Sequence, residues 1–260
     1  MYTEYQPSHL LVPYIDSYWE FKGNPDYGMR IHILPDGCTD FIFTLGEVAN
    51  AVEEGSLIMQ PYRSYFVGPM TKYSELVTYT ESIHMFGVRF LPCGLSCFTN
   101  LPLHEFVNSR VSTNEMKAVF DDTFIEKLGE QKHVTDRIRV VEEYLLAYLA
   151  RHYQPADSHV AMAVNMINHS KGKRSVRSLM DDVCLCQRHF ERKFKHYTGL
   201  TPKEYSRIVK FKNAVELLRT TTSANLLTTA VDAGYYDLAH FSKEIKSMSG
   251  NTPASFLSLT

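Results

Sequence analysis

Residues 188–202 read RHFERKFKHYTGLTP and residues 239–253 read AHFSKEIKSMSGNTP, so the two stretches repeat at a period of 51 residues. Such a repeat indicates that one supersecondary unit occurs twice. Each copy predicts a short helix, a tight turn and a second helix. Thr201-Pro202 and Thr252-Pro253 then place a capping hydroxyl before a proline, which predicts the start of a further helix in each copy.

The second helix of each copy has one apolar and one polar face. Apolar residues recur at core-facing spacing in both copies, namely Phe190 with Phe194 and Phe241 with Ile245. We interpret His189 and His240 as packed scaffold residues. A helix with one packed face and one free face suits a major groove about 12 Å wide. The sequence therefore predicts two helix-turn-helix units that bind double-stranded DNA.

The free positions of these helices are the predicted DNA contacts. They are Gln187, Arg188, Glu191, Arg192 and Lys195 in the first copy, and Leu238, Ala239, Ser242, Lys243 and Lys246 in the second. Arginine donates two parallel hydrogen bonds to guanine, so Arg188 and Arg192 are the predicted base readers. The alternative for both is a phosphate contact or a pair with Glu191. Arg207 and Lys210, between the copies, are predicted phosphate contacts, with a solvated face as the alternative.

Charge is distributed unevenly along the chain. Residues 156–260 hold 15 Lys+Arg and 9 Asp+Glu, whereas residues 1–155 hold 12 and 20. Within the basic part, residues 171–219 hold 13 basic side chains and residues 220–260 hold 2. Because affinity for DNA rises with the number of phosphate contacts, we expect the first unit to supply most of it.

Several spaced positions agree in both copies. The residues that carry the resemblance described next are Leu179, the run 188–195, residues 199–202, Tyr205, Ala214 and Leu217-Leu218, to which the second copy adds Ala230, Gly234-Tyr235, Asp237, His240-Phe241, Lys246, Gly250 and Thr252-Pro253. On these positions, residues 157–260 resemble the DNA-binding domain of the AraC/XylS family of bacterial transcriptional regulators. The resemblance implies that a long helix over 202–218 joins the units. It also implies a sequence-specific regulator whose recognition helices enter successive segments of the major groove. Cys184, Cys186 and Thr229 depart from the family pattern, in which glycine, serine and an aliphatic residue are more usual.

The N-terminal part predicts a β-rich domain. Short strands are expected at Ile31-His32-Ile33-Leu34, Phe41-Ile42-Phe43, 65–67 and 85–90, with a turn at Pro35-Asp36-Gly37. Two helices follow, the first beginning at the capping-box pair Ser112 and Glu115. The expected class is α+β, with a barrel- or sandwich-like domain over 1–155 and an all-α domain of two helix-turn-helix units over 156–260.

Residues 1–130 resemble a sensory domain that is attached to some members of the same family, through stretches such as Leu34-Pro35-Asp36-Gly37 and 87–92. The resemblance implies a small-molecule effector pocket inside the β-rich domain. Its candidate lining is Tyr14, Trp19, Phe41, Phe43, Phe66, Arg89 and Phe90, although each aromatic residue is also a candidate for plain core. Arg89 is expected to pair either with an anionic effector or with a neighbouring carboxylate.

A helix over 134–152 carries Ile138, Val141, Leu145 and Tyr148 on one face. This face is expected either to form an antiparallel seam in a homodimer, as in relatives, or to pack onto the β-rich domain. RNA polymerase is a further possible partner of such a regulator.

Other classes fit less well. The chain has no apolar run of membrane-spanning length and no signal peptide at its first residues, and its 5 cysteines suggest reduced thiols, so a cytoplasmic location is expected. No catalytic set, metal site or cofactor motif is found, and no enzyme activity is expected. Two alternatives remain open. One is a regulator that responds to a protein partner or to its own abundance instead of an effector. The other is an alkyl-transfer repair enzyme, with Cys93 and Cys97 in a zinc site.

Overall fold

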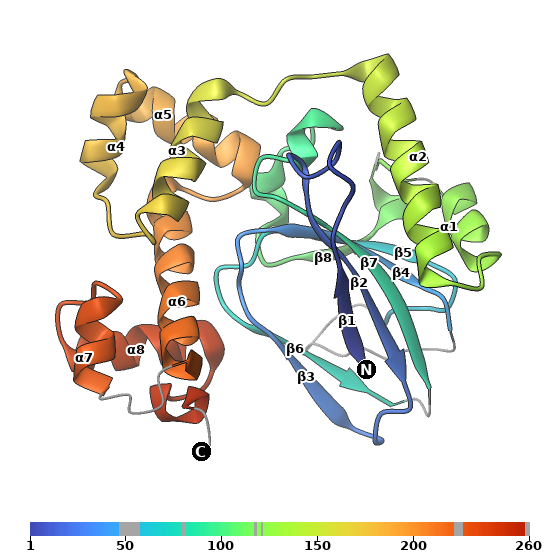
Figure 1. Ribbon diagram of the computed structural model, residues 1–260, viewed down its shortest axis with the longest axis horizontal. Coiled ribbons are helices and arrows are strands. Elements are labelled where there is room, and N and C mark those ends of the chain that lie inside the picture. The colour runs from blue at the N-terminus through green and yellow to red at the C-terminus, as the bar shows by residue number, and fades with distance from the viewer. Residues whose placement is uncertain (47–57, 80–81, 117–118, 121, 221–225, 258–260) are drawn as a thin grey trace.

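The computed structural model describes residues 1–46, 58–79, 82–116, 119–120, 122–220 and 226–257. Its N-terminal part is built from eight strands in the described residues: β1 (Tyr2–Tyr5), β2 (Ile15–Gly23), β3 (Met29–Ile33), β4 (Thr39–Thr44), β5 (Ser64–Val67), β6 (Ser74–Thr78), β7 (Ile83–Phe90) and β8 (Arg110–Ser112). Six of them form an antiparallel sheet in the order β1-β2-β7-β4-β5-β8, and β3 pairs with β6 in a second sheet. The prediction of a β-rich N-terminal domain is confirmed (Figure 1).

The two faces of the large sheet carry different side chains, because successive residues of a strand point to opposite faces. One face packs under α1 (Asp122–Gly129) and α2 (Val134–His152), and its fully buried residues include Phe41, Phe43, Phe66, Phe86 and Phe90. The other face belongs with β3 and β6, and it carries Trp19, Ile42, Tyr65, Val67 and Met85. The domain therefore has an aromatic core on the helix side and a second apolar layer on the opposite side.

The C-terminal part is helical, as predicted. It contains α3 (Ser158–His169), α4 (Val176–Val183), α5 (Gln187–Thr198), α6 (Pro202–Thr220), α7 (Leu226–Asp232), α8 (Leu238–Ser249) and the short 3₁₀ helix η4 (Pro253–Phe256). Helices α4 and α5 form the first helix-turn-helix unit and α7 and α8 the second, with α6 running between them (Figure 1). Thr201 and Glu204 cap α6 reciprocally, since each side chain accepts the other's backbone N–H, at 3.2 and 2.8 Å.

Two local predictions need correction. Ser112 and Glu115 do not start a long helix: Ser112 pairs with Tyr65 as part of β8, only the 3₁₀ turn η3 (Thr113–Glu115) follows it, and α1 begins at Asp122. The strand pairing holds Ser112 in extended backbone, and among the described residues its side chain makes no cap hydrogen bond. In place of the predicted turn at residues 35–37 the chain bends at Gly37, and the segment connects two strands of different sheets, β3 and β4.

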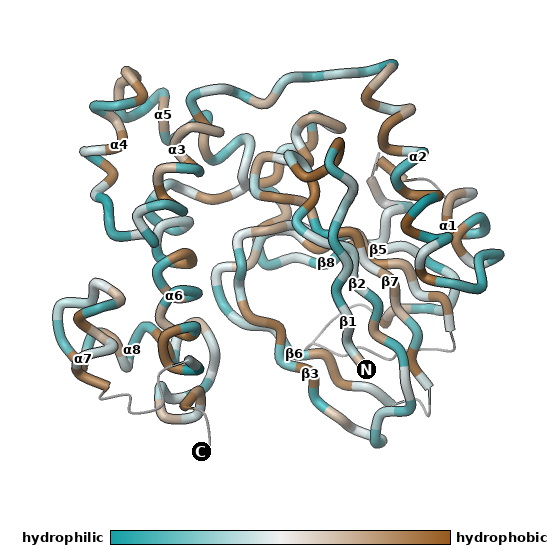
Figure 2. Tube along the Cα trace, in the orientation of Figure 1, coloured by the Kyte–Doolittle hydropathy of each residue, from teal (hydrophilic) through white to brown (hydrophobic). Residues whose placement is uncertain are grey.

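The apolar stripe of α2 packs onto the β-rich domain. Val141 and Leu145 are fully buried in its core, and Ile138 and Tyr148 pack against the same cluster. The solvent side of the helix carries residues such as Thr135, Arg139 and Glu143, and apolar and polar residues alternate along it in Figure 2. Of the two expectations for this stripe, packing on the domain is the one the structure shows. Val141 and Leu145 are fully buried in this packing, whereas Ile138 and Tyr148 are half-buried.

Candidate nucleic-acid interface

The first recognition helix, α5, presents the predicted residues on one face. Phe190 and Phe194 are fully buried on the opposite face and hold the helix to the domain core. Gln187, Arg188, Arg192 and Lys195 are exposed, and Glu191 is half-buried and accepts a hydrogen bond from Gln187 Nε2 at 2.9 Å. All five border a shallow groove of about 450 Å³. This face of α5 is thus free to enter the major groove of DNA.

The second recognition helix, α8, repeats this arrangement with other side chains. Phe241 and Ile245 are fully buried, Ser242 is half-buried, and the exposed positions are Leu238, Ala239, Lys243 and Lys246. The prediction that His240 is a packed scaffold residue is wrong, because the residue is exposed; its ring lies 5.4 Å from the Tyr235 ring, centroid to centroid, at an angle of 73°. His189 at the equivalent position is half-buried.

The turns before the two recognition helices differ in the residue at the left-handed position and in the N-cap hydrogen bond. In the first unit Cys184 occupies the left-handed region at φ 53°, and the side chain of Cys186 at the N-cap makes no cap hydrogen bond within the described residues. In the second unit Gly234 takes the left-handed turn position at φ 85°, and the Asp237 carboxylate accepts the His240 N–H at 2.6 Å. The two departures from the family pattern therefore fall where glycine and a capping residue are favoured.

Arg207 and Lys210 are used inside the domain rather than left free on its surface. Arg207 forms a bidentate pair with Glu244 of α8, with Nε–Oε2 and Nη2–Oε1 distances of 2.9 and 3.0 Å. Lys210 Nζ donates to the Gly234 carbonyl at 3.2 Å and lies 5.5 Å from the centre of the Tyr235 ring. Burial lowers the pKa of Lys210. Each of these two residues therefore attaches α6 to the second unit, and their contact with phosphates stays a prediction.

These two side chains also border a cleft between the units, about 690 Å³ in volume. Lys173, Arg174 and Lys203 contribute to the same cleft, and Glu244 is its one carboxylate among the described residues. The cleft carries a net positive charge, which suits a phosphate backbone.

A second recess lies between the β-rich domain and α6, with a volume of about 720 Å³. The sheets contribute most of its apolar lining and α6 contributes two residues, giving Trp19, Phe21, Ile31, Ile33, Ile42, Leu76, Met85, Phe211 and Val215. We call this recess the interdomain pocket. Its wall is continuous across two domains, so an occupant would contact both.

Arg89 borders the interdomain pocket but is already paired. Its Nε lies 3.2 Å from Asp40 Oδ1 and 3.3 Å from Asp36 Oδ2, and Trp19 Nε1 donates to Asp40 Oδ1 at 2.7 Å. Burial raises the pKa of Asp40, against the opposing effect of the Arg89 guanidinium. Burial would lower the pKa of Arg89, but Asp40 and Asp36 together hold it above its ordinary value. Of the two expectations for Arg89, pairing with neighbouring carboxylates is the one observed.

Only Trp19 and Arg89 of the predicted effector residues line this pocket. Phe41, Phe43, Phe66 and Phe90 point to the helix side of the sheet and are fully buried against one another and against Phe120, while Tyr14 packs edge-on against Phe98. The prediction fails for these five residues because it selected aromatic type and ignored the two-residue period of a strand. That period would have grouped Trp19 with Phe21 and Asp40 with Ile42. The contributions of Phe211 and Val215 had no signal in the sequence.

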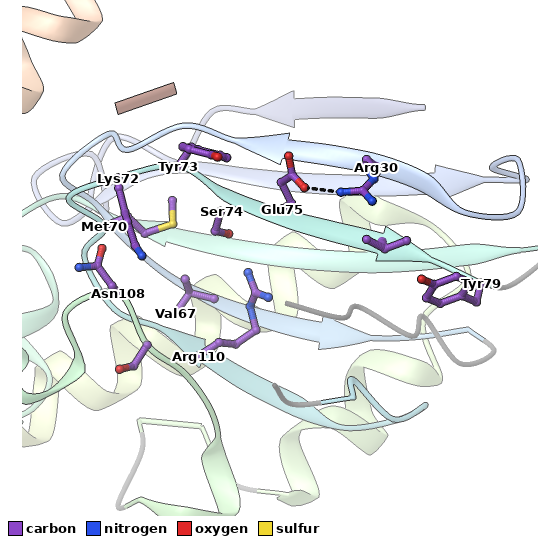
Figure 3. A pocket seen from close by; sticks show the side chains of 12 residues that line it. Arg30, Val67, Met70, Lys72, Tyr73, Ser74, Glu75, Tyr79, Asn108 and Arg110 are labelled. Carbon is purple, nitrogen blue, oxygen red and sulfur yellow. Dashed lines mark hydrogen bonds and ion pairs between the residues drawn. The ribbon is translucent and has the colours of Figure 1, made fainter. Parts of the chain in front are cut away.

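A third recess of about 790 Å³ lies beside the interdomain pocket and shares Val67, Met70 and Arg110 with it. It is polar, and Figure 3 shows Glu75 directed at Arg30, with which it forms an ion pair of 2.9 Å. The apolar and polar recesses are therefore neighbours that meet at Met70.

The cysteines do not form a metal site in the described part of the chain. Cys93 precedes the short helix η1 (Leu95–Cys97), and Cys97 is the last residue of that helix. Cys184 and Cys186 lie in the turn before α5. The described residues contain no cluster of three or more His, Cys, Asp or Glu side chains able to hold a metal ion. Among the described helices, none combines the length and the apolar character needed to cross a bilayer.

Comparison with known families agrees with this architecture. Residues 179–258 match a family described as a helix-turn-helix domain, and residues 3–112 match a domain of unknown function, DUF6597. The fold and the C-terminal match define a DNA-binding transcription regulator with a separate N-terminal domain. Its C-terminal domain carries two helix-turn-helix units, and the family match falls on residues 179–258 of that domain. A search of curated proteins gives no match.

Solved structures show the same fold at low sequence identity. ToxT from Vibrio cholerae has a TM-score of 0.52 and 9% identity, covering 94% of this chain and 100% of its own. ToxT from the same organism bound to an unsaturated fatty acid has a TM-score of 0.51 and 11% identity, covering 93% and 95%. ToxT bound to (E)-4-(8-methylnaphthalen-1-yl)but-3-enoic acid has a TM-score of 0.51 and 9% identity, covering 93% and 98%.

Proposed function

We propose that the chain is a sequence-specific regulator that inserts α5 and α8 into successive segments of the major groove. The observation that carries this proposal is the pair of equivalent free faces, one on each recognition helix, that the 51-residue repeat presents. Two groove segments read by one chain give a longer recognition sequence than a single helix reads.

The faces of α5 and α8 are expected to contribute unequally to DNA recognition. The α5 face offers Arg188, Arg192 and Lys195, and a bidentate arginine–guanine contact is worth about 1–3 kcal/mol of discrimination. The α8 face offers Lys243 and Lys246 with Leu238 and Ala239, which suit phosphates and thymine methyl groups. Since Arg207 is held by Glu244, the second unit has no arginine on its face in the described residues.

This division is tested by DNA binding of two single variants. Duplexes selected by the wild-type chain from a random pool serve as the probe, and affinity is measured over a range of salt concentrations. Arg192→Ala is expected to weaken binding by about tenfold or more and to relax the base preference at one position. Lys243→Ala is expected to weaken binding less and to lower the salt dependence by about one phosphate contact. Equal losses from both variants would contradict the division of labour.

A small apolar effector is proposed to bind in the interdomain pocket and to modulate DNA binding. The pocket's volume of about 720 Å³ and its apolar lining support this, as do the ToxT structures that hold an unsaturated fatty acid and a naphthyl-butenoic acid. The pocket touches both domains, so an occupant that fits one relative placement better shifts the population towards it.

A thermal-shift series with an unsaturated fatty acid and its methyl ester tests the pocket. Val215→Trp fills it from α6 and is expected to abolish the ligand-induced rise in melting temperature. Val231→Trp, at a position of α7 that is 60% exposed, is the matched control and keeps the rise. Unchanged melting of the wild type with every apolar compound tried would favour the second candidate, a regulator controlled by a protein partner or by its own abundance. In either case the proposed setting is the cytoplasm, with promoter DNA and RNA polymerase as partners.

A further inference from the structure

Both recognition helices end on a glycine that touches the N-terminal domain. Gly199 and Gly250 occupy equivalent positions of the repeat, and both adopt the left-handed conformation that ends a helix, at φ 78° and 72°. A β-carbon placed on Gly199 would lie 2.6 Å from Cγ of Pro69, and one on Gly250 would lie 2.7 Å from Cζ of Tyr73. The two contacts are therefore closer than any side chain would permit.

Pro69 and Tyr73 belong to one short segment, residues 68–73, which joins β5 to β6. We call this segment the brace. It reaches the end of α5 with one end and the end of α8 with the other. Leu103 strengthens the first contact, because its carbonyl oxygen would lie 2.9 Å from the same β-carbon on Gly199. The residues that contact the two recognition helices, Pro69 and Tyr73, are thus only four peptide bonds apart in the chain.

The brace is itself firmly held. The Asn108 side chain accepts the Thr71 N–H at 2.8 Å, and the Asn108 N–H donates to the Pro69 carbonyl at 3.0 Å. The Tyr73 ring stacks on His32 with an interplanar angle of 5° and a centroid distance of 5.3 Å. Figure 3 shows Met70, Lys72 and Asn108 gathered at one end of the polar recess. Because these contacts fix the brace, a displacement of one of its ends also moves the other end.

The two units are consequently connected twice. Helix α6 joins them through the covalent chain, and the Arg207–Glu244 pair fixes α6 to α8. The brace joins the opposite, C-terminal ends of α5 and α8 by contact alone. Because the spacing between recognition helices sets the spacing between the DNA segments they read, a second connection narrows the range of DNA that fits.

We propose that Pro69 and Tyr73 are positioning residues for DNA recognition, and that the brace sets the separation of the two recognition helices. This inference rests on the proposed function. It also gives the interdomain pocket a route to the DNA face, because Met70 of the brace lines that pocket and is 8% exposed. An occupant that displaces Met70 moves the contacts at Gly199 and Gly250 together.

The test selects duplexes from a random-sequence pool with the full-length chain and compares the spacing between the two selected sequence elements. Wild type is expected to select a single spacing. Tyr73→Ala and Pro69→Ala are expected to select additional spacings and to bind the wild-type duplex about fivefold more weakly, at the low end of typical coupling between sites. Tyr73→Phe keeps the ring and is expected to restore the single spacing.

Tyr79→Ala is the matched control, because Tyr79 lies at the far end of the polar recess from Tyr73 and is 39% exposed (Figure 3). A loss of fold shows as a lowered melting temperature and as weaker binding to single-element duplexes, whereas loss of the brace leaves binding to a single element unchanged. If Tyr73→Ala and Pro69→Ala select the wild-type spacing at wild-type affinity, the inference is overturned. If the wild type selects no sequence at all, the proposed function fails instead.

Discussion

Replacing Cys186 by serine is expected to stabilise the first recognition helix. Cys186 is the N-cap of α5 and has the extended backbone of a cap, φ −65° and ψ 149°, yet its side chain accepts no cap hydrogen bond within the described residues. Its equivalent in the second unit, Asp237, accepts the His240 N–H at 2.6 Å. The His189 N–H donates to the Cys186 carbonyl at 3.1 Å, and a serine Oγ at 186 is expected to give this N–H a better acceptor. A good cap contributes about 1 kcal/mol.

The gain is measurable in two independent ways. For a domain of about 100 residues, 1 kcal/mol corresponds to a rise of about 4 °C in melting temperature. Hydrogen exchange of the first-turn amides of α5 slows about fivefold for the same free energy, because 1.4 kcal/mol is a factor of ten. Asp237→Ala is the reciprocal control and is expected to lose about 1 kcal/mol at α8. The reasoning is refuted if Cys186→Ser leaves the exchange of the α5 amides unchanged while Asp237→Ala accelerates that of α8.

Three further outcomes follow from local geometry. Cys184→Gly is expected to raise the free energy of unfolding by about 1 kcal/mol, because glycine adopts φ 53° without the steric cost of a β-carbon; unfolding in denaturant measures it. Gly87→Ala is expected to cost about 2 kcal/mol or more and to shift the emission of Trp19, since the added carbon would lie 1.9 Å from the indole. Burial opposes the charge of Asp157, but Lys193 and two backbone N–H groups outweigh this effect and hold the pKa of the Asp157 carboxylate below its ordinary value. The ionised carboxylate therefore stabilises the fold at neutral pH. This contribution is lost as the pH falls through the lowered pKa. Asp157→Asn is expected to be less stable at pH 7 and to show a flatter acid limb in pH-dependent melting.

The helical domain was predictable because its signals are local. The side-chain period of α5 places Phe190 and Phe194 on one face and therefore Arg188 and Arg192 on the other, whatever the helix packs against. Thr201 and Glu204 cap α6 through residues three apart. These two features depend on residues within one or two turns of a single helix, and the sequence located both of them.

Most of the features that sequence reasoning missed join distant segments. Glu244 captures Arg207 across 37 positions, so a side chain that looks like a free surface cation is committed to the fold. Ser112 has capping-box spacing to Glu115, but its pairing with Tyr65 decides its backbone. Of the predicted effector residues, Phe41, Phe43, Phe66 and Phe90 lie on the helix side of the sheet and do not line the interdomain pocket, because aromatic content does not reveal which face meets α6. Partners of this kind become visible only when the strands are placed side by side.

The difference between the two units follows from how the fold uses its cations. The first unit leaves Arg188, Arg192 and Lys195 exposed, so its face retains the charge that attracts phosphates and the forked groups that read guanine. Arg207 and Lys210 of α6 contact the second unit and secure it against α6, and the free face of α8 carries two lysines. Cations that are used in contacts within the protein fix the position of the unit, but they contribute less to its affinity for DNA. Because α8 is fixed both by these contacts and by the brace at Gly250, its place on the DNA is decided by the rest of the chain. We therefore expect the second unit to determine which spacing is accepted, and the first to determine how tightly the accepted DNA is held.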